Sequence, residues 1–142
     1  MADAAPHHLT VRVYWEDTDA AGIVYYANYL KFAERGRTEL LRALGIDQGQ
    51  LRARTGLTFA VRRCVCDYLR PARLDDALTI ETAIAAVGAA TCTMRQRVLR
   101  GHELLAEIEV TVACVAATGR PARLPPAIRH VLAVFRSEFP TD

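Results

Sequence analysis

Apolar and polar residues alternate over positions 11–16, and this two-residue period predicts a strand with one buried face. The segment 16–22 that follows is acidic, rich in small side chains and closed by a glycine, so it predicts a loop. Over positions 26–44 the apolar residues recur at three- and four-residue steps, which predicts one long helix with a single apolar stripe. We expect Gly45 to end this helix in a left-handed conformation, and Asn28 or a residue just before it to cap the start.

Four further strands are predicted in the second half of the chain, after a polar connection in which we expect a short helix. They are apolar runs of strand length, separated by short segments that contain glycine or proline and suit chain reversal. These strands are 59–69, 78–86, 92–98 and 104–116. Their succession predicts an antiparallel meander. Pro125 and Pro126 then precede a short terminal helix, which we place within 125–137.

One long helix and one antiparallel sheet make an α+β domain. The 142 residues fit a single domain, because a second core would leave each half too little apolar surface to offset its ordering entropy. We therefore treat 1–142 as one domain, in which we expect residues 1–8 to be loose. One helix can cover only one broad face of the sheet, so the sheet edge and the remaining apolar surface predict a homo-oligomer, either a homodimer or a homotetramer.

The composition is that of a soluble globular protein, with 51% hydrophobic and 24% charged residues. A net charge of +2 is too small to indicate a nucleic-acid partner, since such proteins concentrate a clear basic excess on one face. The start of the chain does not resemble a secretory signal, and no apolar run is long enough to span a bilayer. These features predict a cytoplasmic protein without a membrane span.

Cysteine and histidine form no metal-site pattern in this sequence. The four cysteines lie in apolar or strand-like segments without the spacing of metal ligands, so we expect them to be reduced and buried. Cys64 and Cys66 would share one face of a strand, and metal or redox chemistry there is the less favoured alternative. No histidine lies near the acidic loop, and the sequence has no phosphate-binding glycine loop or nucleophile elbow. We expect no metal and no cofactor.

The acidic loop carries Asp17 and Asp19 just before the predicted helix, and from these residues alone solvated charges or partners of the helix dipole are the better interpretation. The surrounding string changes this interpretation. It reads YWEDTDAAGIVYYANY over 14–29 and FAERGRTE over 32–39. This stretch resembles the signature of the 4-hydroxybenzoyl-CoA thioesterase family of hotdog proteins, and most closely its Tol-Pal-associated acyl-CoA thioesterase branch. Later segments, including 70–72, resemble the family more loosely.

The resemblance implies the hotdog fold, in which a five-stranded antiparallel sheet wraps one long helix, and it implies a catalytic role for Asp19. Asp17 is then the supporting acid. A carboxylate beside a helix N-terminus is suited to attack a thioester carbonyl or to activate a water, and both routes remain open. The resemblance also makes the backbone N–H of Tyr26 the principal donor to the carbonyl oxygen, with Gly22 allowing close approach of the chain.

Contacts with the rest of the substrate are expected from several segments. We expect the ring of Tyr25 to line the pocket, and Asn28 either to touch the acyl group or to cap the helix. The ring of Tyr26 stands where the Tol-Pal branch often has histidine, so we expect pocket lining rather than acid-base chemistry from it. The family commonly has basic residues and a small hydroxyl at the turn between the middle strands. Only Thr91 matches this pattern, so we expect it to contact the substrate, and the basic residues are missing. We expect Arg120 and Arg123 to hold the phosphates of coenzyme A in place of those missing residues. The equally favoured alternative is that both are solvated loop charges.

Two features inside the predicted helix have structural explanations. Gly36 interrupts the apolar stripe at a cost of about 1 kcal/mol relative to alanine, and close packing against another backbone would explain it, with simple tolerance as the alternative. Glu34 is within reach of an acyl pocket, but we favour an ordinary surface pair with Arg37 three residues later.

The function predicted from the resemblance is acyl-CoA hydrolysis to free CoA and a carboxylic acid. Acyl-carrier protein is an alternative donor, and neither the length nor the aromaticity of the acyl group follows from the sequence. A hotdog dehydratase is a rival interpretation, although it would pair its acid with a histidine. A non-catalytic module that binds acyl-CoA or acyl-carrier protein is the third.

Overall fold

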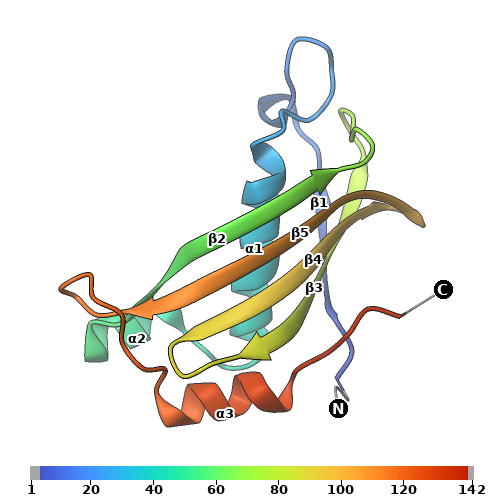
Figure 1. Ribbon diagram of the computed structural model, residues 1–142. Helices are drawn as coiled ribbons and strands as arrows, with labels where there is room; N and C mark the ends of the chain where they lie inside the picture. The colour runs from blue at the N-terminus through green and yellow to red at the C-terminus, as the bar shows by residue number, and fades with distance from the viewer. Residues whose placement is uncertain (1–3, 141–142) are drawn as a thin grey trace.

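The computed structural model describes residues 4–140, in which one five-stranded antiparallel sheet wraps one long helix (Figure 1). The strands are β1 (His7–Arg12), β2 (Thr58–Tyr68), β3 (Ala77–Val87), β4 (Thr91–Arg100) and β5 (Glu103–Val115). The helices are α1 (Asn28–Ala43), α2 (Gln48–Thr55) and α3 (Pro126–Val134), with a single 3-10 turn, η1, at Trp15–Asp17. The sheet order is β1-β3-β4-β5-β2, so β1 and β2 form its edges. This architecture confirms the predicted α+β hotdog fold.

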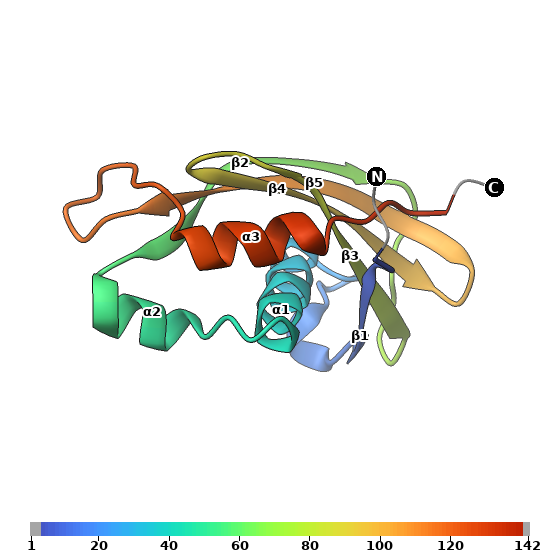
Figure 2. The same ribbon diagram turned by 90° about the horizontal axis from the view of Figure 1, so that it is seen from below.

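The sheet arches over α1, and α2 and α3 lie at the end of the molecule where α1 terminates (Figures 1 and 2). The buried stripe of α1 includes Phe32, Ala33 and Leu40, as its periodicity predicted. Gly36 lies in this stripe, where a Cβ would come within 2.7 Å of Ile80 Cγ2. Close packing therefore explains the glycine, although its neighbours are side chains of the sheet rather than backbone.

The strand predicted over 11–16 is wrong from Val13 onward. β1 ends at Arg12, and Trp15 lies in the turn η1 with 80% of its surface exposed. The carboxylate of Asp17 accepts a hydrogen bond from the backbone N–H of Tyr14 at 2.8 Å. This local bond favours a turn over a continued strand, because a short acidic side chain can satisfy backbone donors that a sheet would otherwise pair.

The C-terminal end of α1 agrees with the prediction from the sequence, and its N-terminal cap does not. Gly45 has a φ of +80° just beyond the helix, which confirms the predicted left-handed stop. The helix begins at Asn28, and the preceding Ala27 offers no side-chain cap. Asn28 was expected as the cap, but its side-chain amide instead donates to the backbone carbonyl of Asp17 at 2.8 Å.

β2 is an exposed edge strand, and a bulge in its middle changes which alternate residues face α1. Val61 pairs with Val112 of β5, and Arg63 pairs with the next residue, Thr111, so one residue of β2 is extra. Because successive side chains alternate in direction, this bulge moves the helix-facing set from odd to even positions. Phe59 and Val61 face α1 before the bulge, and Tyr68 faces it afterwards.

The remaining expectations fall on peripheral segments. His7 and His8, which we expected in a loose start, belong to β1. All four cysteines are free, but Cys64 is exposed because its strand is uncovered, so the expected burial is wrong there. Within residues 4–140, no helix has the length and apolar character needed to cross a membrane.

Candidate active site

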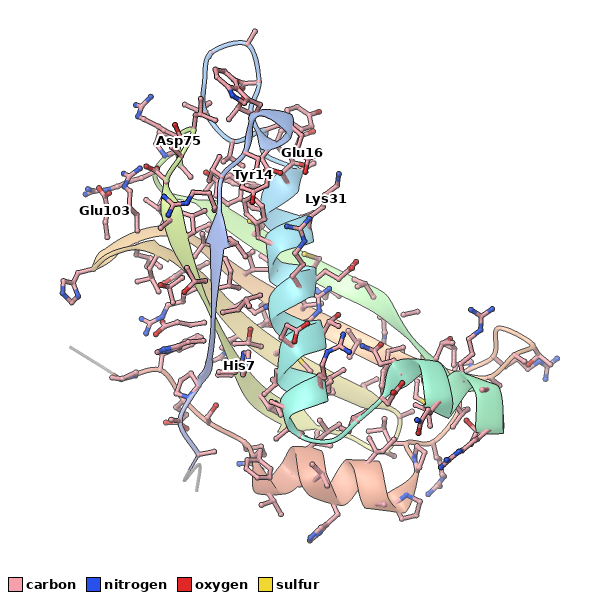
Figure 3. The ribbon with its side chains drawn as sticks, turned by 180° about the vertical axis from the view of Figure 1, so that it is seen from behind. His7, Tyr14, Glu16, Lys31, Asp75 and Glu103 are labelled. Atoms are coloured by element: carbon pink, nitrogen blue, oxygen red, sulfur yellow. The ribbon has the colours of Figure 1, made fainter. Side chains whose placement is uncertain are left out.

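The loop between η1 and α1 is a short hairpin at the end of the molecule where α1 begins, close to the labelled Tyr14 and Glu16 in Figure 3. Thr18 and Val24 form an isolated antiparallel bridge. Inside it, the N–H of Asp19 donates to the carbonyl of Ile23 at 2.9 Å. The hairpin therefore holds Asp19 beside the segment that leads directly into α1.

Asp17 is the structural acid of this loop. It is buried, and besides its bond to Tyr14 its backbone carbonyl accepts from the N–H of Tyr25 at 2.9 Å and from Asn28 Nδ2 at 2.8 Å. These bonds tie η1 to the start of the helix. The side chain of Asp17 points back into the turn, so it is not available to a substrate.

Asp19 has the opposite environment. Its side chain is exposed, and Oδ1 accepts from the backbone N–H of Ala21 at 2.8 Å, which fixes the orientation of the carboxylate. Oδ2 has no hydrogen-bond partner within the described part of the chain. Gly22 closes the turn with a φ of +79°, a left-handed conformation that side chains with a Cβ rarely adopt. The loop thus presents a fixed carboxylate oxygen to the outside.

The residues just before α1, which follow the Asp19 hairpin along the chain, present free backbone donors. Between residues 4 and 140, no acceptor is found for the N–H groups of Tyr26 and Ala27, whereas the N–H of Asn28 donates to Tyr25 O at 2.8 Å. Tyr26 as a whole residue is 61% exposed, so this segment lies at the surface. Free N–H groups at a helix start carry partial positive charge and suit an oxygen on which negative charge develops.

A strap over residues 70–76 holds the hairpin and the helix start together. The carbonyl of Ala72 accepts from the N–H of Val24, and its N–H donates to the hydroxyl of Tyr29 on α1, both at 2.9 Å. Arg100 clamps the strap through a 2.7 Å bond to Asp76. Our sequence reasoning did not assign a role to these residues. The loose family resemblance at 70–72 was the available signal.

Four tyrosine rings surround the helix start. The rings of Tyr25 and Tyr26 are 4.9 Å apart, and Tyr68 of β2 lies edge-on to Tyr26 at 6.0 Å and to Tyr29 at 5.4 Å. The hydroxyl of Tyr68 donates to the carbonyl of Tyr26 at 3.0 Å. Burial raises the pKa of Tyr68 and of Tyr29, so both hydroxyls stay protonated at neutral pH.

This site and fold agree with the comparisons to known proteins, in which residues 13–132 match the family model of the thioesterase-like superfamily. The chain belongs to this superfamily. It is 48% identical over 105 residues to the acyl-CoA thioesterase YbgC of Haemophilus influenzae, covering 74% of this chain and 77% of that protein. It is 44% identical over 120 residues to the acyl-CoA thioester hydrolase YbgC of Escherichia coli O6:H1, with coverages of 83% and 89%. The crystal structure of a probable thioesterase from Bartonella henselae has a TM-score of 0.82 at 40% identity, covering 85% of this chain and 100% of that chain. These matches confirm the resemblance to hotdog thioesterases.

In this thioesterase-like chain the expected phosphate contacts lie far from Asp19. Thr91, Arg120 and Arg123 sit at the end of the sheet where α1 terminates, opposite the acidic hairpin (Figure 1). Arg123 lines a cavity of about 490 Å³ together with Arg129 and His130. A single copy therefore does not bring the predicted phosphate contacts and Asp19 together.

The thioesterase-like fold also has a partly open cavity of about 230 Å³ between α1 and the sheet. Its apolar wall comes from α1, β2, β4, β5 and α3. The apolar lining residues are Leu41, Phe59, Val61, Cys92, Met94, Val112 and Leu132. Glu34 and Arg37 also line it, and within the described chain they form no ion pair. Arg37 instead donates to Gln96 at 3.0 Å, because this buried amide offers an acceptor inside the fold, so the predicted surface pair is wrong.

Proposed function

We propose that this protein hydrolyses acyl-CoA thioesters to free coenzyme A and a carboxylic acid. The observation that carries the proposal is the pairing of an oriented, exposed carboxylate, Asp19, with free backbone N–H groups at the start of α1. The names of the YbgC relatives support this reaction, and their identity of 44–48% extends over most of the chain.

In the proposed reaction the carbonyl oxygen of the thioester accepts hydrogen bonds from the free N–H groups of Tyr26, the principal donor, and Ala27. These donors stabilise the negative charge that develops on the oxygen as the carbonyl carbon is attacked. Asp19 either attacks that carbon itself, forming an anhydride that water then opens, or takes a proton from an attacking water. In both routes the carbon–sulfur bond breaks, the thiolate of coenzyme A leaves, and one water is consumed overall.

The proposed active unit is a homodimer formed through β2. The outer edge of β2 has no strand partner within residues 4–140, and Val61 is 54% exposed. A second copy that pairs antiparallel along this edge would continue the sheet and satisfy its backbone. Phe59 of one copy would then lie beside Tyr68 of the other, because antiparallel strands run in opposite directions. The cavity next to Phe59 would adjoin the second copy's Asp19 loop, so we assign the acyl group to this cavity.

The phosphates of coenzyme A are assigned to the opposite end of the sheet. The cavity around Arg123 contains two arginines and a histidine and no acidic side chain. Arg129 also donates to the carbonyl of Gly88 at 3.2 Å, which braces the turn that leads to Thr91. In an antiparallel dimer this end of one copy lies toward the Asp19 end of the other, which is where a long substrate would need it.

The deciding experiment compares Asp19→Asn with Glu16→Gln, an exposed acid of the neighbouring turn. Thiol release is followed over short, long and aromatic acyl-CoAs and over one acyl-carrier-protein thioester. We expect Asp19→Asn to lower kcat at least about 100-fold at an unchanged melting temperature, and Glu16→Gln to behave like the parent. Parental turnover by Asp19→Asn would refute the proposal. Inactivity of the parent on every thioester would favour a binding module instead.

A further inference from the structure

Tyr68 makes a long-range hydrogen bond to the segment that supplies the carbonyl-binding donors. It is the last residue of β2, and its hydroxyl donates to the carbonyl of Tyr26 at 3.0 Å across a separation of 42 residues. Its ring also packs edge-on against Tyr26 and Tyr29, at 6.0 Å and 5.4 Å between centroids. The side chain is therefore held by contacts as well as by its hydroxyl.

This bond controls the direction of a backbone donor. The carbonyl of Tyr26 and the N–H of Ala27 belong to the same planar peptide unit and point to opposite sides of it. Tyr68 holds the carbonyl side, and this restrains the direction in which the N–H side points. A hydrogen bond to a peptide carbonyl also polarises that peptide and strengthens its N–H as a donor.

Other restraints on the helix start do not act on this peptide unit. Asn28 binds the carbonyl of Asp17, and Tyr29 accepts from the N–H of Ala72. Ala27, at the N-cap position, has no side-chain hydrogen bond. Tyr68 is thus the side chain that the structure places on the Tyr26–Ala27 peptide.

We infer that Tyr68 is a positioning residue that aims the backbone N–H of Ala27, which lies next to the free N–H of Tyr26, at the thioester carbonyl oxygen. The inference rests on the proposed thioesterase function and adds a residue of β2 to the site. Tyr68 does not exchange a proton with the substrate in this role, since its hydroxyl is occupied by a backbone carbonyl. It acts through the geometry of the helix start.

The test is Tyr68→Phe, which removes the hydroxyl and keeps the ring contacts. Loss of one neutral hydrogen bond predicts a fall in kcat/KM of roughly 2- to 13-fold, with the shape of the pH profile unchanged. Tyr14→Phe, the same change at an exposed tyrosine of the neighbouring turn, is the matched control and should leave kcat/KM at the parental value.

Two inert analogues separate positioning from a merely structural role. A ketone analogue, with CH₂ in place of the thioester sulfur, keeps the carbonyl oxygen, whereas an S-alkyl thioether of coenzyme A lacks it. Tyr68→Phe should weaken the ketone several-fold and leave the thioether unchanged. Equal weakening of both analogues would overturn the inference alone. So would a parental kcat/KM for Tyr68→Phe when the Asp19→Asn variant is inactive. Full activity of Asp19→Asn would instead overturn the proposed function and this inference with it.

Discussion

Gly36→Ala tests the packing of α1 on the sheet with the smallest possible change. The added Cβ would lie 2.7 Å from Ile80 Cγ2, 2.9 Å from Thr82 Oγ1 and 3.1 Å from Gln96 Nε2. Gln96 cannot retreat freely, because its amide donates to Ala33 O at 2.8 Å and to Thr82 Oγ1 at 2.9 Å. The methyl group therefore meets Ile80 together with two side chains, Thr82 and Gln96, that are already fixed by buried hydrogen bonds.

The magnitude follows from three opposing effects. Alanine gains about 1 kcal/mol of helix propensity over glycine. Overpacking of a filled core costs about 1–3 kcal/mol, and each weakened hydrogen bond costs about 1 kcal/mol more. We expect a net loss of about 1–3 kcal/mol in the free energy of unfolding, which for a chain of this size lowers the melting temperature by about 3–10 °C.

The measurement is urea and thermal unfolding followed by circular dichroism, at a fixed protein concentration because association shifts apparent stability. Gly49→Ala in α2 is the control, since its Cβ would meet nothing closer than Asp47 Oδ1 at 3.4 Å. It should stabilise the protein by up to about 1 kcal/mol. A Gly36→Ala protein as stable as the parent would show that close packing is not what requires this glycine.

Two other features give independent predictions. The open edge of β2 predicts a dimer, with a sedimentation mass of twice the 15.7 kDa chain. Val61→Glu should shift the protein toward monomer. A monomeric parent at micromolar concentration would contradict the proposed assembly. Burial raises the pKa of the Cys92 thiol to about 12, so between pH 7 and 9 its thiolate stays below about one part in a thousand. Mass spectrometry should find iodoacetamide on Cys92 only after the protein is unfolded in urea, because this residue is 2% exposed. Labelling of Cys92 in the folded protein as fast as in urea would refute the buried environment.

The helices and strands in which apolar residues recur regularly over many positions could be predicted from the sequence. The stripe on α1 and the β3–β4–β5 meander each repeat one pattern over many residues, so a local error does not change the result. The first strand failed where the pattern was short. Residues 13–16 follow the alternation, but β1 ends at Arg12, and the carboxylate of Asp17 accepts from the backbone N–H of Tyr14 in a turn instead.

The candidate site was predicted only in part, for a physical reason. The acidic hairpin and the helix start are contiguous, so a family signature could point to Asp19 and Tyr26. Tyr68 reaches Tyr26 from 42 residues away, and Tyr29 meets Ala72 across 43 residues. Such bonds depend on strand order and register, which the local sequence does not contain. The same applies to Arg37, whose partner Gln96 comes from a distant strand.

The extra residue in β2 allows two side chains of that strand, Phe59 and Tyr68, to face α1 although one has an odd and the other an even position. Without the bulge between Val61 and Arg63, strict alternation would turn Tyr68 away from α1 whenever Phe59 faced it. The cavity wall and the tyrosine at the helix start share one strand only because that strand changes phase between them. If Arg62 were deleted, β2 could place either Phe59 in the cavity wall or Tyr68 on Tyr26, but not both. A one-residue deletion or insertion here should therefore be much less tolerated than one in the loop around Gly119.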